Sequence, residues 1–189
     1  MQQNHPLVSI NLLAYNGEKY LDKCLKSVFN QRYPNLEIFI IDNNSTDKTK
    51  DYLKKMPDKP ELKIIFNEKN LGYAGGHNQA IKISKGKYIL CLNQDMFLDR
   101  EFIQNAVEAL EKKDNIAAVQ GKLLRWSLGN VSLEISKDNE IFYIIDTAGL
   151  SIFKNRRIIG QTKNPDKLSE SFVEWRLLKW TPELRSSHP

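Results

Sequence analysis

The chain has 189 residues, which fits one domain and is enough to bury a core. Hydrophobic residues make up 41% and charged residues 27% of the sequence, proportions typical of a water-soluble globular protein. The formal net charge of +5 suits anionic ligands such as nucleotides, or an anionic membrane surface. Basic residues are scattered among acidic ones along the chain, so no basic stripe indicates nucleic-acid binding.

The first six residues lack the basic and apolar segments of a secretion signal, and no apolar run reaches the roughly 18 residues that span a bilayer. We therefore expect a cytoplasmic protein without a membrane span, with peripheral association at the inner face of the membrane as an option. The two cysteines, Cys24 and Cys91, fall in helical and strand patterns and indicate neither a disulfide framework nor a zinc site.

Over the first 120 residues, apolar runs typical of buried strands alternate with amphipathic helical patterns. The strands are expected at 7–13, 36–41, 62–66, 88–92 and 116–121, and the helices at 18–30, about 46–55, 79–84 and 99–113. This alternation predicts an α/β fold with a mostly parallel sheet and helices on both faces.

Polar segments follow three of these strands: Tyr15–Asn16, Asp42–Asn44 and Asn93–Asp95. A fourth segment, 67–78, holds three glycines and is expected to be a loop where the backbone passes close to a ligand. Right-handed crossovers bring the carboxyl ends of parallel strands to one edge of a sheet, which is where open α/β sheets bind ligands. The sequence therefore predicts one binding site at this edge.

The segment Asn93-Gln94-Asp95 places an amide oxygen and a carboxylate two residues apart. Oxygen ligands suit a hard cation, so the pair predicts binding of Mg²⁺ or Mn²⁺. Taken alone, the segment favours a polar turn in which Asp95 or Asp99 caps the next helix; the other polar strand ends at the same edge favour the metal site instead.

Other site residues have simpler alternatives. Asp42 could cap the following helix, although Ser45 and Thr46 are better placed to do so. Tyr15 could belong to the core, but the Asn-Gly turn after it favours exposure. His77 follows two glycines and is expected to be a solvent-facing loop residue rather than a ligand.

After Gly121 the pattern changes to shorter strands, expected at 123–126, 131–135 and 141–145. A β-hairpin is expected within 146–160, over the edge that carries the site. The segment 163–189 is polar and contains three prolines, and a short amphipathic helix is expected at 172–180. We therefore predict a domain at 5–162 and an atypical tail at 163–189.

Four of these motifs resemble those of family 2 nucleotide-sugar glycosyltransferases, which have the GT-A fold. The motifs occur in the family's order as Val8-Ser9-Ile10 with Tyr15-Asn16, residues 40–47 (IIDNNSTD), residues 70–78 (NLGYAGGHN) and Leu92-Asn93-Gln94-Asp95. The form of residues 70–78, with Asp146-Thr147-Ala148-Gly149-Leu150, resembles the rhamnosyltransferase-like branch.

The resemblance implies transfer of a sugar from a nucleotide-diphosphate donor, such as a dTDP- or UDP-sugar, to a saccharide or lipid-linked acceptor, with inversion. In such a site the base lies near the first strand end, a carboxylate accepts its N3–H group, and a divalent cation bridges protein and diphosphate. The donor-binding residues it implies are Tyr15, Asn16, Asp42, Asn44, Asn70, Gly72, Asn78, Asn93 and Asp95. Asn93 departs from the acidic first position of the family's metal motif, so Asp95 is expected to be the main metal ligand, with Asn93 beside it.

The family's acidic general base has no convincing counterpart in this sequence, because the surroundings of Glu170 and Glu174 do not match. We therefore expect a truncated product, or a pseudoenzyme that binds the donor without turnover, as the alternative to an active transferase. A dinucleotide oxidoreductase is disfavoured, since Ala14-Tyr15-Asn16-Gly17 replaces the glycine pattern of such enzymes.

Overall fold

The computed structural model describes residues 5–112 and 116–121, together with the backbone of short strands beyond them at 123–124, 134–135, 141–142, 145–147, 150–152, 158–160 and 177–179. The chain divides into two compact units. The first is Met1–Ala117 with Leu177–Pro189, and the second is Ala118–Arg176.

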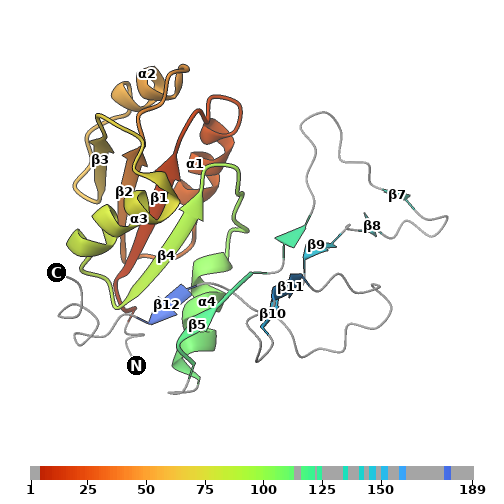
Figure 1. Cartoon of the computed structure of the whole chain (residues 1–189). Coiled ribbons are helices and arrows are strands. Elements are labelled where there is room, and N and C mark those ends of the chain that lie inside the picture. The colour runs from red at the N-terminus through yellow and green to blue at the C-terminus, as the bar shows by residue number, and fades with distance from the viewer. Residues whose placement is uncertain are drawn as a thin grey trace. The chain divides into compact units, whose positions relative to one another are not determined.

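The first unit is built on a mainly parallel sheet (Figure 1). Its parallel strands are β1 (Val8–Ala14), β2 (Leu36–Asp42), β3 (Leu62–Phe66) and β4 (Tyr88–Asn93), in the order β3-β2-β1-β4. A short strand, β12 (Leu177–Lys179), pairs antiparallel with β4. The predicted parallel sheet is confirmed, with each of its four strands within a residue of the expected bounds.

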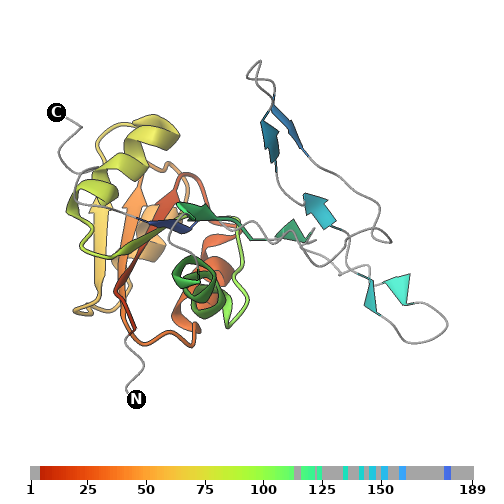
Figure 2. The ribbon, with the colours of Figure 1, turned by 90° about the horizontal axis from the view of Figure 1, so that it is seen from below.

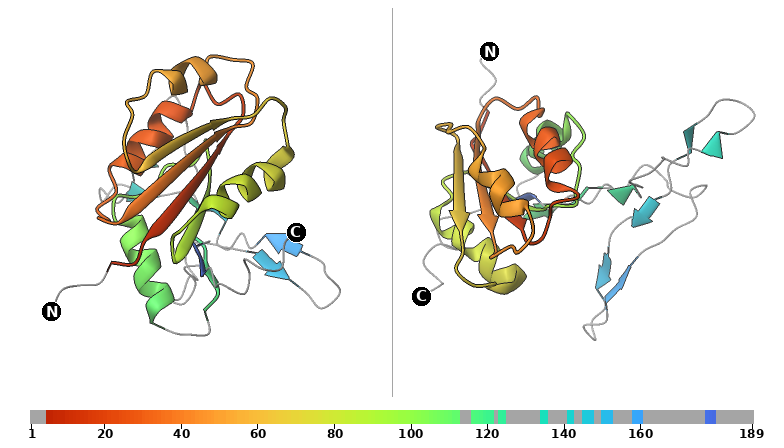
Figure 3. Two further views of the ribbon diagram at one scale, coloured as in Figure 1. Left: turned by 90° about the vertical axis from the view of Figure 1, so that its left-hand side faces the viewer. Right: turned by 90° about the horizontal axis from the view of Figure 1, so that it is seen from above.

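Helices cover both faces of this sheet. They are α1 (Leu21–Phe29), α2 (Thr49–Lys54), α3 (Gly72–Ile83) and α4 (Phe102–Glu111). The views in Figures 2 and 3 place α3 on one face of the sheet and α1 with α4 on the other. This layering confirms the predicted α/β class, because strands that are apolar on both faces need cover on both.

The register of the strands brings their polar ends to one level. Ala14 lies beside Asp42 across the β1–β2 pair, and Leu13 lies beside Asn93 across the β1–β4 pair. The residues that follow these positions therefore emerge together at the carboxyl edge of the sheet, as the sequence predicted.

The glycine-rich segment differs from its prediction as a loop. Helix α3 begins at Gly72 and includes Gly75, Gly76 and His77. A Cβ atom on Gly76 would stand 2.3 Å from Leu13 Cδ1, so the missing side chain lets the helix pack closely on β1. The expected loop over 67–78 is therefore wrong beyond residue 71, because close packing outweighs the low helix propensity of glycine.

Two smaller predictions also fail. Helix α2 begins at Thr49, and the N–H of Thr49 donates to Asp47 Oδ1 at 3.0 Å, so neither Ser45 nor Thr46 caps the helix. The helix expected at 172–180 is wrong at 177–179, where the chain forms β12 instead. Pairing with the edge of β4 satisfies backbone groups there and overrides local propensity. Residues 172–176 and 180 lie outside the described part.

The second unit contains short strands. They are β5 (Ala118–Val119), β6 (Leu123–Leu124), β7 (Glu134–Ile135), β8 (Ile141–Phe142), β9 (Ile145–Thr147), β10 (Leu150–Ile152) and β11 (Ile158–Gly160). Strands β10 and β11 pair antiparallel, which confirms a hairpin within 146–160. Glu170 and Glu174 lie outside the described residues, and the boundary predicted between 162 and 163 stays a prediction.

Among the helices that the structure describes, none is long and apolar enough to cross a membrane.

Candidate functional site

The segment after β1 is joined by hydrogen bonds to the segment after β2. The backbone N–H of Asn16 donates to Ser45 Oγ at 3.0 Å, and the N–H of Thr46 donates back to Asn16 Oδ1 at 2.8 Å. Asn16 has a φ of 50°, a left-handed conformation that asparagine tolerates better than most residues. The side chain that the sequence predicted to bind a ligand therefore also holds two strand ends together.

Tyr15 lies at the exposed end of β1, with 44% of its surface accessible, which confirms the expected exposure. Its backbone is fixed by a residue of the β4 end. The N–H of Tyr15 donates to Gln94 Oε1 at 2.7 Å, and Gln94 Nε2 donates to the carbonyl oxygen of Tyr15 at 2.8 Å. The sequence indicated the segment Asn93–Asp95 but no role for its middle residue.

Asp42 is fully buried at the end of β2. Its carboxylate oxygens accept the N–H of Ser45 at 3.3 and 3.4 Å, and Lys50 Nζ lies 3.9 Å from Oδ2. A buried carboxylate needs this kind of compensation by donors and a counter-charge. Asp42 therefore shapes the turn after β2, and its predicted contact with a base stays a prediction.

A network of amide side chains, which the sequence patterns did not predict, stabilises the entry to α3. Asn43 is buried, and its Nδ2 group donates to Asn70 Oδ1 at 2.8 Å and to the carbonyl of Gly72 at 3.2 Å. Its Oδ1 atom accepts from Asn67 Nδ2 at 3.1 Å and from the N–H of Leu71 at 3.0 Å. Three asparagines in adjacent strand-end segments were the available signal, but their partners lie 24 to 29 residues away.

The remaining predicted residues of the edge differ in exposure. Asn70 Oδ1 also accepts the N–H of Gly72 at 2.8 Å, so its oxygen is occupied within the protein. Gly72 has a φ of 73°, a left-handed conformation that glycine adopts without the strain a side chain would add. Asn78 is exposed on α3, and Asn44 is half-buried with a φ of 67°. Asn78 is thus one of the polar groups that a ligand could reach without local rearrangement.

His77 is buried, with 3% of its surface accessible, so the expected solvent-facing loop position is wrong. Its ring packs edge-on against Tyr73, with 4.6 Å between ring centroids. Neither ring nitrogen has a hydrogen-bond partner among the described residues. Burial lowers the pKa of His77 below its usual value of 6.5, because the charged form loses its hydration.

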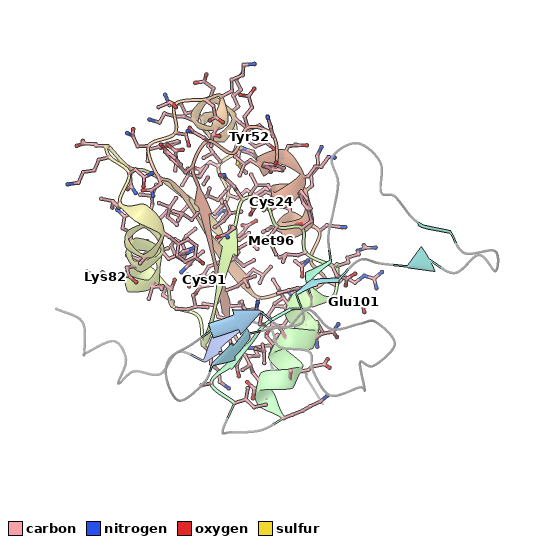
Figure 4. The ribbon with its side chains drawn as sticks, turned by 45° about the vertical axis from the view of Figure 1, so that its right-hand side comes forward. Cys24, Tyr52, Lys82, Cys91, Met96 and Glu101 are labelled. Atoms are coloured by element: carbon pink, nitrogen blue, oxygen red, sulfur yellow. The ribbon has the colours of Figure 1, made fainter. Side chains whose placement is uncertain are left out.

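Asn93 and Asp95 form an exposed corner at the end of β4. Beneath it, Cys24 of α1 donates from Sγ to the carbonyl oxygen of Asn93 at 3.6 Å. Figure 4 shows Cys24 and Met96 close together between α1 and the β4 end. Burial, and next the negative charge of Asp95, raise the pKa of the Cys24 thiol to about 12, so it remains a neutral donor.

The donor chemistry of this corner fits a hard divalent cation. Asp95 supplies a carboxylate and Asn93 an amide oxygen, both exposed. Within the described residues there is no cluster of three or more His, Cys, Asp and Glu side chains that could hold a metal. The residues therefore suit Mg²⁺ or Mn²⁺ held jointly with ligand phosphate and water, since such ions bind through one or two carboxylates.

A parallel sheet with helices on both faces and polar side chains gathered at its carboxyl edge defines an open α/β domain, a class that binds ligands at that edge. The chain belongs to glycosyl transferase family 2, whose model matches residues 9–160. It is 34% identical, over 77% of its length, to a Methanococcus voltae protein described as a dolichyl N-acetyl-α-D-glucosaminyl phosphate 3-β-D-2,3-diacetamido-2,3-dideoxy-β-D-glucuronosyltransferase.

Two solved structures share the fold. The chain is 26% identical to the S. aureus TarS 1-349 complex with UDP, with a TM-score of 0.55 over 68% of the chain. It is 25% identical to mannosyltransferase PcManGT from Pyrobaculum calidifontis, solved with GDP-Man and Mn²⁺, with a TM-score of 0.57 over 65% of the chain. The chain spans 47%, 38% and 37% of these three proteins, respectively, so it matches less than half of each.

Proposed function

We propose that the chain binds a nucleotide-diphosphate sugar at the carboxyl edge of the sheet and transfers the sugar to a saccharide or lipid-linked acceptor. The observation that carries this proposal is the joining of the β1, β2 and β4 ends into one hydrogen-bonded edge with exposed polar groups. Family membership and the nucleotide-bound neighbours support it.

In this proposal, Tyr15 and Asn16 lie along the nucleobase and Asp42 accepts its N3–H group. Because Asp42 is fully buried, base recognition requires a local opening that exposes its carboxylate. Asn44, Asn70, Gly72 and Asn78 border the ribose and the sugar.

Asn93 and Asp95 would hold Mg²⁺ or Mn²⁺ together with the diphosphate. When bound, the cation neutralises charge on the leaving diphosphate. Asp95 contributes the protein's negative charge to this corner, and Asn93 contributes a neutral oxygen. The neutral Cys24 thiol fixes the carbonyl of Asn93 and so helps to hold the backbone of the corner in place.

Inversion at the sugar carbon is part of the proposal and follows from the family resemblance. The form of residues 70–78 favours a deoxysugar donor such as dTDP-rhamnose. A lipid-linked acceptor is supported by the dolichyl phosphate substrate in the name of the M. voltae relative. Such an acceptor would bring the protein to the inner face of a membrane.

Calorimetry with UDP-, dTDP- and GDP-sugars, with and without Mn²⁺, tests the proposal. Cation-dependent binding of one donor, with slow release of its sugar to water or to an added acceptor, is the expected result. Binding without sugar release would instead indicate a donor-binding module. Failure to bind any of the three donors in either condition would refute the proposal.

A further inference from the structure

Gln94 is the middle residue of the β4 corner, and its side-chain amide continues the pairing between β1 and β4. The backbone pairing of these strands ends where Leu13 lies beside Asn93. Beyond that point, the Gln94 amide accepts from the N–H of Tyr15 at 2.7 Å and donates to the carbonyl of Tyr15 at 2.8 Å. We call these two hydrogen bonds the Gln94 clamp.

The absence of a side chain at Gly17 makes room for the clamp. A Cβ atom at Gly17 would stand 2.2 Å from Gln94 Oε1 and 2.6 Å from Gln94 Cδ, closer than real atoms approach. Its φ is not in the left-handed region, so alanine could adopt the backbone conformation at this position. The conflict created by alanine would therefore be with Gln94 and not with the local backbone.

We propose that Gln94 is a positioning residue that couples the cation-and-diphosphate corner to the nucleobase side of the edge. The inference rests on the proposed function and assigns a role to a side chain that contacts neither the base nor the cation in that proposal. Through the clamp, a shift of the Asn93–Asp95 corner moves Tyr15 with it. Two parts of the site, 79 residues apart in sequence, are thus held in register before a ligand binds.

Such preorganisation acts on affinity more than on stability. Both hydrogen bonds of the clamp are exposed, so water can replace them when Gln94 is changed and the folded state loses little. A ligand that touches both parts of the site must then order them itself, and that cost is subtracted from its binding free energy.

The test measures binding of UDP with Mn²⁺ to the full 189-residue chain by calorimetry. Gln94→Met keeps the side-chain volume and removes both hydrogen-bonding groups. We expect its affinity for UDP to fall about three- to tenfold with little change in thermal unfolding, as loss of about one net hydrogen bond implies. Gln104→Met, at a half-buried glutamine of α4 whose side chain donates to Glu108 in an exposed hydrogen bond, is the matched control and should bind UDP like wild type.

A double-mutant cycle separates the clamp from a general disturbance of the edge. Gly17→Ala should weaken UDP binding in the wild-type background, because its Cβ displaces Gln94. In the Gln94→Ala background the same change should add nothing, since the atoms it would strike are gone. Equal effects of Gly17→Ala in both backgrounds would overturn the inference.

Amide exchange of Tyr15 reads the clamp without any ligand. It should be faster in Gln94→Met than in wild type, and unchanged exchange would overturn the inference even where UDP binds. Wild-type affinity in Gln94→Met would also overturn it and leave the proposed function intact. Absence of binding of UDP and of all three donors to wild type would refute the proposed function, and the coupling role would fall with it.

Discussion

Replacing Asn43 should lower the free energy of unfolding, because this one side chain bonds to several segments at the carboxyl edge of the sheet. It is buried and takes part in four hydrogen bonds: three join the end of β2 to the entry of α3, and one joins it to Asn67 at the end of β3. In Asn43→Ala, the N–H of Leu71 and the carbonyl of Gly72 lose this partner, while Asn67 and Asn70 keep other bonds. Net losses of about 1 kcal/mol for each of the four bonds, reduced where water or another side chain replaces the partner, predict a destabilisation of about 2–4 kcal/mol.

Chemical denaturation of wild type and variant measures this free energy, and amide exchange over α3 locates it. Exchange should accelerate most in the first turn of α3, at Gly72 and the residues after it. Asn105→Ala, an exposed change on α4, is the matched control and should cost less than about 0.5 kcal/mol. A loss of less than about 0.5 kcal/mol for Asn43→Ala would refute the view that the amide network holds this helix.

Three further results are expected. Asp95→Ala should abolish Mn²⁺-dependent UDP binding without changing the unfolding temperature, whereas the exposed change Asp58→Ala should leave both intact; unchanged binding in Asp95→Ala would return the corner to a simple turn. Because burial lowers the pKa of His77, the unfolded chain takes up a proton on this ring near pH 6.5 and the folded chain does so only at lower pH. Stability should therefore fall as the pH drops below 6.5, by up to about 1.4 kcal/mol per unit. His77→Phe should lack this component, and an identical pH profile would refute it. Cys24, with a thiol pKa of about 12, should resist iodoacetamide at pH 8 in the folded chain, and rapid alkylation detected by mass spectrometry would contradict its burial.

The strands and the edge could be predicted because they depend on patterns within a few residues. Apolar runs that end in polar segments located β1 to β4 to within a residue, and parallel pairing then required their ends to meet. The glycine-rich entry to α3 could not be predicted in the same way. Its conformation is decided by the close approach of Gly76 to Leu13, a residue 63 positions away in sequence.

The sequence also could not predict which polar side chains of the edge bond to the protein backbone and which are available to a ligand. The sequence alone does not indicate that Asn43 accepts a hydrogen bond from the backbone N–H of Leu71, or that Gln94 accepts one from the backbone N–H of Tyr15. Asparagine and glutamine can serve a ligand or the backbone with the same groups, and only the distance to a partner decides which. The strand β12 was missed for a related reason, since its pairing partner β4 lies far away in the chain.

The structure also sorts the predicted site residues into two groups that mutation can tell apart. Asn16, Asp42 and Asn70 already accept hydrogen bonds from the backbone of the protein. Replacing them should therefore lower both the stability and the affinity for a donor. Asn78 and Asp95 are exposed, so replacing them should change affinity alone. Affinity and unfolding free energy measured together for all five variants would separate the groups, and a loss of stability in Asp95→Ala equal to that in Asp42→Ala would show that the sorting is wrong.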